Sequence, residues 1–231
     1  MKRTILAWLG LVVALTFPMG VEGVSAEIIT FDLLSPNSAI SSYLAPFANV
    51  NVNRTDSTHA TVTFQSYVTG GYQYLMGDGS TVALNVSATS FTVSPVTDIN
   101  SLGGAFTPTW KQTNIASGQQ VDGLGKFNLT VDSVDGFKDS STKVQFTLTD
   151  TSGTWASALA VLLPNSGGSS AAAHIFVCAT GTCDPSVTAL ATGYASNLAP
   201  VPAPAALLLF GSGLVGLVGH QWRRRRSANP A

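Results

Sequence analysis

The sequence is poor in charged side chains and in the residue types that most enzymes use for chemistry. Charged residues make up 10% of the 231 residues, well below the roughly 25% of ordinary soluble domains. There are 2 cysteines and 3 histidines, and the patterns H-E-x-x-H, G-x-S-x-G and G-x-x-x-x-G-K-[ST] do not occur. We therefore expect no enzyme: no catalytic residue, no metal site and no cofactor.

Positive charge is scarce in the central part of the chain. Between positions 27 and 199 there are five basic residues against eleven acidic ones. A nucleic-acid-binding protein needs a basic face to meet phosphates, so a nucleic-acid partner is excluded. The hydrophobic content of 45% is enough for a core. Low charge, 22 glycines and many hydroxyl side chains are typical of an exported β-protein.

The N-terminal 26 residues have the three parts of a secretory signal peptide. Lys2 and Arg3 give a short positive region, and an apolar run follows over 5–15. Small residues at Val24-Ser25-Ala26 suit signal peptidase, so we predict cleavage after Ala26. The apolar run is much shorter than the ~20 residues that a membrane-spanning helix requires.

The C-terminal end also has three parts. Residues 205–219 form an apolar stretch without charge. As a helix, 201–219 would be about 28 Å long, close to the ~30 Å hydrocarbon core of a bilayer. The flanking arginines would stay on the cytoplasmic side and stop transfer, which leaves the rest of the chain on the far side. The short motif before the stretch is Val201, Pro202, Ala203 and Pro204, and the basic cluster after it is Arg223, Arg224, Arg225 and Arg226.

This tripartite end resembles the PEP-CTERM sorting signal of Gram-negative bacteria. The resemblance covers 200–226, and Ala203 stands where many members carry Glu. It implies that an exosortase, a membrane transpeptidase, recognises the motif at 201–204 and removes the helix. It also implies a transient inner-membrane anchor, then release to the cell envelope or extracellular matrix beside exopolysaccharide. Residues 227–231 are a short tail.

Residues 27–199 are predicted to form one domain. Apolar and polar residues alternate over 61–68, 81–86, 127–132 and 143–149, as expected for half-buried antiparallel strands. Glycine-rich turns separate these runs, and no long helical periodicity precedes the C-terminal signal. The sequence therefore predicts an all-β antiparallel β-sandwich ectodomain. It also predicts that 126–132 and 143–149 pair as a hairpin.

Aromatic and acidic residues in this domain leave alternatives open. Tyr72 and Tyr74 share one strand face beside a glycine-rich turn, so they are candidate glycan contacts, whereas Trp110 and Trp155 are expected in the core. His174 is expected to be a partly exposed strand residue. One acidic loop could offer oxygens to Ca²⁺, but its spacing does not match the EF-hand pattern and Asp-Gly is a common turn dipeptide. The acidic residues of that loop are Asp132, Asp135 and Asp139.

The two cysteines, Cys178 and Cys183, are separated by four residues. An even number of cysteines in an exported chain predicts a disulfide. A zinc site would need two further ligands. Because the closed loop is short, the bond should stabilise the fold by only about 2 kcal/mol.

Two functions agree with these observations. The first is a non-enzymatic surface or matrix protein, processed by signal peptidase and exosortase, with a structural or exopolysaccharide-associated role. The alternative is a carbohydrate-binding module that uses exposed aromatic side chains.

Overall fold

The computed structural model describes residues 26–100, 110–133, 140–181, 183 and 188–197. The predicted signal peptide and the predicted sorting signal lie outside these ranges. Within them, no helix is long and apolar enough to cross a membrane. Two short 3-10 turns, η1 (Ser38–Ile40) and η3 (Leu159–Val161), are the described helical elements.

Strands make up most of the described chain, as the alternating sequence pattern predicted. Their bounds are β1 (Glu27–Leu33), β2 (Ser35–Pro36), β3 (Ala48–Arg54), β4 (His59–Ser66), β5 (Val68–Thr69), β6 (Tyr72–Gly77), β7 (Val82–Leu84), β8 (Phe91–Val93), β9 (Thr97–Asn100), β10 (Trp110–Val121), β11 (Gly125–Ser133), β12 (Ser140–Asp150), β13 (Ala171–Ala179) and β14 (Ala191–Ser196).

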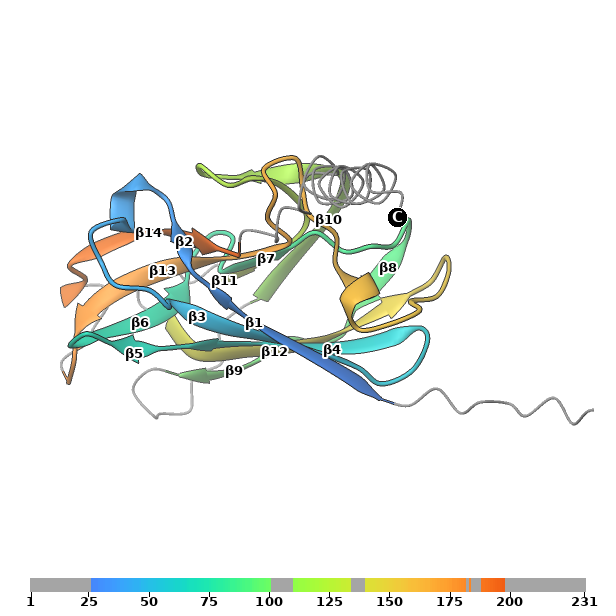
Figure 1. Ribbon diagram of the computed structural model, residues 1–231, viewed down its shortest axis with the longest axis horizontal. Helices are drawn as coiled ribbons and strands as arrows, with labels where there is room; N and C mark the ends of the chain where they lie inside the picture. Colours follow the sequence, from blue (N-terminus) through green and yellow to red (C-terminus); the bar gives the residue numbers. More distant parts are fainter. Residues whose placement is uncertain (1–25, 101–109, 134–139, 182, 184–187, 198–231) are drawn as a thin grey trace, which may run out of the picture.

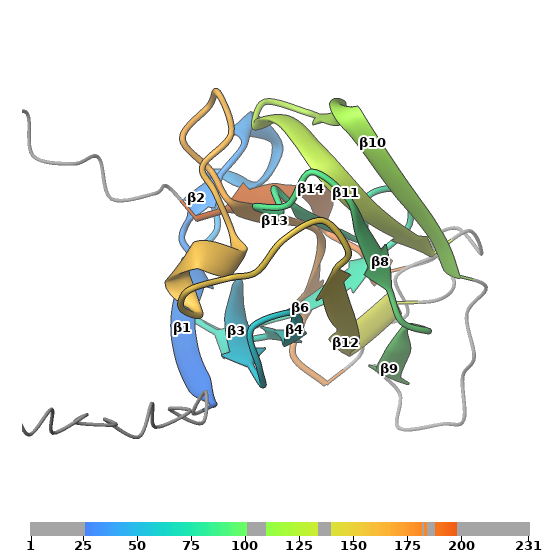
Figure 2. The same ribbon diagram turned by 90° about the vertical axis from the view of Figure 1, so that its right-hand side faces the viewer.

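In the described part of the chain, the strands form a single 14-stranded sheet rather than two separate sheets. Its main order is β1-β3-β4-β12-β6-β13-β7-β11-β10, and every pair is antiparallel. The sheet folds over itself, so that β11, β13 and β14 lie above β3, β4 and β12 (Figure 1 and Figure 2). The all-β antiparallel prediction is confirmed. The layers are continuous because β12 pairs with β4 over most of its length and with β6 at its first two residues.

The predicted hairpin between 126–132 and 143–149 is wrong. β11 pairs with β10 on one side and β7 on the other, so both of its edges are occupied. β12 pairs with β4, β6, β8 and β9 instead. The strand joined to β11 by a tight turn is β10, and the turn lies at Asp122-Gly123, where Gly123 has a φ of +74°. An Asp-Gly dipeptide is a strong hairpin signal.

The core lies between the two layers. Alternate residues of β3, β4 and β12 point inward and meet inward residues of β6, β7, β11 and β13. The inward residues of the first three strands are Ala48, Val50, Val52, Ala60, Val62, Phe64, Val144, Phe146 and Leu148. This period-two burial is why the alternation was readable in the sequence.

One end of the core is covered by the long connection between β12 and β13, residues 151–170. Trp155 in this connection is buried, and its indole Nε1 donates a hydrogen bond to the Ser87 carbonyl at 2.8 Å. The backbone N–H of Ala158 donates to Oε2 of Glu27 at 2.8 Å. The connection, called the capping loop below, is therefore tied to the start of β1.

Candidate functional site

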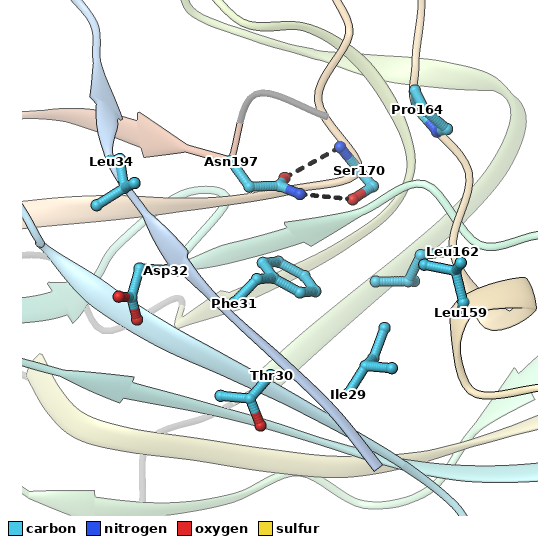
Figure 3. A pocket seen from close by; sticks show the side chains of 10 residues that line it. All are labelled: Ile29, Thr30, Phe31, Asp32, Leu34, Leu159, Leu162, Pro164, Ser170 and Asn197. Carbon is cyan, nitrogen blue, oxygen red and sulfur yellow. Dashed lines mark hydrogen bonds between the residues drawn. The ribbon is translucent and has the colours of Figure 1, made fainter. Parts of the chain in front are cut away.

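A cavity of about 560 Å³ opens between β1 and the capping loop. Figure 3 shows it from close by. Ten residues line it: Ile29, Thr30, Phe31, Asp32, Leu34, Leu159, Leu162, Pro164, Ser170 and Asn197. It is called the β1 cavity below.

The first wall of the β1 cavity is the edge strand β1. Among the described strands β1 has one ladder neighbour, β3, so its other edge is not covered by a strand. Ile29 and Phe31 pack against the core but stay partly exposed. Their side chains point toward the capping loop, whereas Thr30 and Asp32 point away (Figure 3). Strand alternation therefore gives the cavity an apolar wall.

The second wall is the segment of the capping loop around η3. Leu162 is buried and forms a β-bridge with Val86. The backbone N–H of Leu163 donates to the Asn85 carbonyl at 2.9 Å, which fixes the segment against the sheet. Leu159 remains 71% exposed at the cavity rim. The segment thus presents leucine side chains on a backbone that is held in place.

The carboxylate and hydroxyl of the β1 wall are already hydrogen-bonded. Oδ1 of Asp32 accepts hydrogen bonds from Nδ2 of Asn49 at 2.8 Å and from the Tyr67 hydroxyl at 3.0 Å. Burial, reinforced by Asp32, raises the pKa of Tyr67. Oγ1 of Thr30 accepts from an asparagine of β3 at 3.0 Å. Neither side chain is therefore placed to act on a molecule in the cavity.

The polar groups at the other end of the cavity are also hydrogen-bonded. Oδ1 of Asn197 accepts the backbone N–H groups of Ser170 and Ala171 at 3.1 and 2.8 Å. Its Nδ2 donates to Oγ of Ser170 at 2.8 Å. The cavity is consequently suited to take up an apolar group, and it has no acid–base pair among its lining residues.

The predicted aromatic glycan site is not formed as expected. Tyr74 is fully buried, packs its ring against Phe47 at 4.9 Å, and donates its hydroxyl to the Leu44 carbonyl at 2.6 Å. Tyr72 is half-buried and meets Tyr43 edge-to-face at 5.0 Å. The exposure expected for Tyr74 is wrong because β6 lies within the sheet, and all its residues from Tyr74 onward are buried.

His174 is also more buried than the sequence suggested, at 8% exposure. Its ring stacks on Tyr194 at 4.4 Å, and Nε2 lies 2.8 Å from the Thr192 hydroxyl. Nδ1 has no hydrogen-bond partner in the structure. Burial lowers the pKa of His174, against a weaker opposing effect of Asp78, and burial raises the pKa of Tyr194 to about 12. The histidine is therefore a neutral core residue.

The acidic loop can be followed only in part. Asp132 accepts the backbone N–H of Ser80 at 2.5 Å, and burial raises its pKa against that hydrogen bond. Asp135 and Asp139 lie outside the described residues. Within the described ranges, no group of three or more His, Cys, Asp or Glu side chains is arranged to hold a metal ion.

Cys178 and Cys183 are joined by a disulfide, with their Cα atoms 5.4 Å apart. Both are buried and pack with Leu75 and Phe176 in a small cluster apart from the main core. The bond closes the turn after β13, which the close spacing in the sequence had indicated.

Comparison with known proteins bears on the C-terminal end. Residues 200–226 match the family model of the PEP-CTERM protein-sorting motif. Neither the comparison with curated proteins nor that with solved structures gives a match. The predicted sorting signal is therefore confirmed over the range that the sequence indicated. For the β domain, the information comes from its structure.

Proposed function

We propose that this chain, which carries a PEP-CTERM protein-sorting motif at residues 200–226, is an exported, non-enzymatic protein of the cell envelope or extracellular matrix. Signal peptidase removes residues 1–26. The C-terminal helix holds the chain in the inner membrane, and an exosortase trims it at the motif and releases the β domain. The sorting motif carries this proposal.

The β domain supports a structural role more than a catalytic one. Its layers share one continuous core, and the polar groups of the β1 cavity are hydrogen-bonded to the protein itself. We interpret the folded-over sheet as a sandwich-type scaffold that displays a hydroxyl-rich surface in a polysaccharide matrix. Stacking on sugars by an exposed row of tyrosines is not favoured, because Tyr74 is buried.

The arginine cluster provides the test. Four arginines resist translocation, and the apolar stretch before them contains four glycines, which weaken a helix. Replacing Arg223–Arg226 by glutamine should let some chains pass through the membrane untrimmed. Deleting 201–204 should leave the chain anchored and uncut. Replacement of the four arginines by lysine keeps the charge and should behave as wild type.

The readout is the mass of the protein in the membrane and in the medium of the native host. Wild-type protein in the medium should begin at Glu27 and end near Pro204. If the glutamine variant is trimmed and released as efficiently as wild type, the tail does not act as a stop signal and the proposal is refuted.

A further inference from the structure

We propose that the β1 cavity binds residues 198–204 of the same chain, the tail segment that follows Asn197. The proposal concerns the β domain and its own C-terminal extension. It rests on the trimming proposed above and concerns the released chain that ends near Pro204, because 201–204 belong to the 201–219 helix while the chain is anchored.

The point at which the tail leaves the domain is part of the cavity wall. Asn197 lines the cavity, and its side chain is held by three hydrogen bonds to Ser170 and Ala171. Its backbone N–H donates to the Ala171 carbonyl at 3.2 Å. These contacts fix the position of Asn197 in the cavity wall, and the tail segment continues from it. Docking the tail therefore closes only a very short loop.

The tail segment, as an extended polyproline II helix, would be about as long as β1, the strand that forms one wall of the cavity. The sequence of the segment is L-A-P-V-P-A-P, with prolines at 200, 202 and 204. Alternating prolines favour a polyproline II helix, with three residues per turn and about 3.1 Å per residue. Leu198, Val201 and Pro204 then share one face, and the seven residues span about 22 Å. The seven-residue β1 spans about 24 Å.

The chemistry of the tail segment also matches the cavity. The seven residues are uncharged and apolar, and the prolines carry no N–H group that would need an acceptor. The cavity offers Ile29, Phe31 and leucine side chains, and its polar groups are already hydrogen-bonded. Thr30 and Asp32 point away from the capping loop (Figure 3), so a hydrated ligand such as a sugar would meet mostly apolar side chains in the lining.

Exposed apolar residues around the β1 cavity give docking a driving force. Leu34 and Leu159 line the cavity and are 55% and 71% exposed. Covering such a patch removes apolar surface from water, which is favourable.

Thiol labelling tests the proposal on the trimmed protein released by the native host. The variant Leu159→Cys places a thiol at the cavity rim, and the native cysteines are joined in a disulfide. Labelling by a water-soluble maleimide is compared with the same variant that also carries Leu198→Ser and Val201→Ser. If the tail is docked nine-tenths of the time, labelling of Leu159→Cys should be about tenfold slower with the native tail.

Leu190→Cys is the matched control. Leu190 is 54% exposed and precedes β14, whereas Asn197 follows β14. The strand between them is roughly 23 Å long, but the four residues from Asn197 to Val201 reach at most about 14 Å. Labelling at Leu190→Cys should therefore be the same with the native and the substituted tail.

Three results would overturn the proposal. Equally fast labelling of Leu159→Cys with native and substituted tails would show that the tail does not cover the cavity, and equally slow labelling would show that something other than the tail covers it. Protection that disappears on dilution would assign the cavity to a second copy of the chain. The mass of the released protein reports trimming separately, so that a failure of docking and a failure of trimming are distinguishable.

Discussion

The first residue of the predicted mature chain holds the capping loop in place, and this contact can be measured. Oε2 of Glu27 accepts the Ala158 N–H at 2.8 Å and lies 3.7 Å from a guanidinium nitrogen of Arg54. Glu27→Ala removes both contacts. The hydrogen bond to a carboxylate contributes about 1–2 kcal/mol. The ion pair contributes less than about 1 kcal/mol, because the Glu27 side chain is 44% exposed.

We therefore expect Glu27→Ala to lower the free energy of unfolding by about 1–2 kcal/mol. Glu27→Gln is the matched control: it keeps an oxygen that can accept the Ala158 N–H and removes only the charge. It should cost less than about 1 kcal/mol.

Urea unfolding of the exported protein, followed by tryptophan fluorescence, measures both variants, and the buried Trp155 reports on the same loop. With a urea m-value of about 2 kcal/mol/M, the midpoint of Glu27→Ala should fall by about 0.5–1 M. An unchanged midpoint would refute the contact. A loss in Glu27→Gln equal to that in Glu27→Ala would refute the assignment of most of the energy to the hydrogen bond.

Two further predictions concern the cysteines and the buried histidine. Replacing Cys178 and Cys183 by serine should lower the free energy of unfolding by about 2 kcal/mol. Alkylation of unreduced, freshly exported protein should label neither cysteine, and labelling of both would reject the disulfide. For His174, the folded-state pKa lies below the ordinary value near 6.5, so the unfolded chain binds more protons as the pH falls through that value. Stability should therefore decrease from pH 7.5 to 5.5, and this slope should be smaller in His174→Gln. Asp132 has a raised folded-state pKa and contributes a slope of the opposite sign, which is the same in wild type and in His174→Gln and therefore cancels when the two are compared. An equal slope of stability against pH in both proteins would contradict the assignment to His174.

Local alternation predicted the strands that have one face in the core. In β4 and β12, residues such as Val62 and Phe146 are buried while their neighbours face outward, so the sequence has a period of two. Strand partners were not predictable in this way, because alternation fixes the face of a residue and not the neighbour of a strand. The exposure of Tyr74 was mispredicted for a related reason, since β6 is covered on both faces.

The sorting signal was predictable because its parts are contiguous in the sequence, whereas the β1 cavity was not. Ile29 and Phe31 alternate like ordinary core residues, and only the edge position of β1 leaves them partly exposed. The other wall comes from a connection more than a hundred residues later. Its length, 151–170, was the available signal, because long connections inside compact domains are uncommon and often functional.

The pairing of β2 with β14 sets the order in which the domain can be completed during export. Ser35 is paired with Ser196, roughly 160 residues further along the chain. The first strand and its neighbours can form early, but the pairing of β2 with β14 forms only after Ser196 has crossed the membrane. Ser196 is separated by fewer than ten residues from the apolar stretch at 205–219. With the anchoring proposed above, arrival of the stop signal at the translocon and closure of the fold would be nearly simultaneous, and the anchored interval would give this slow, non-local step time to finish before release.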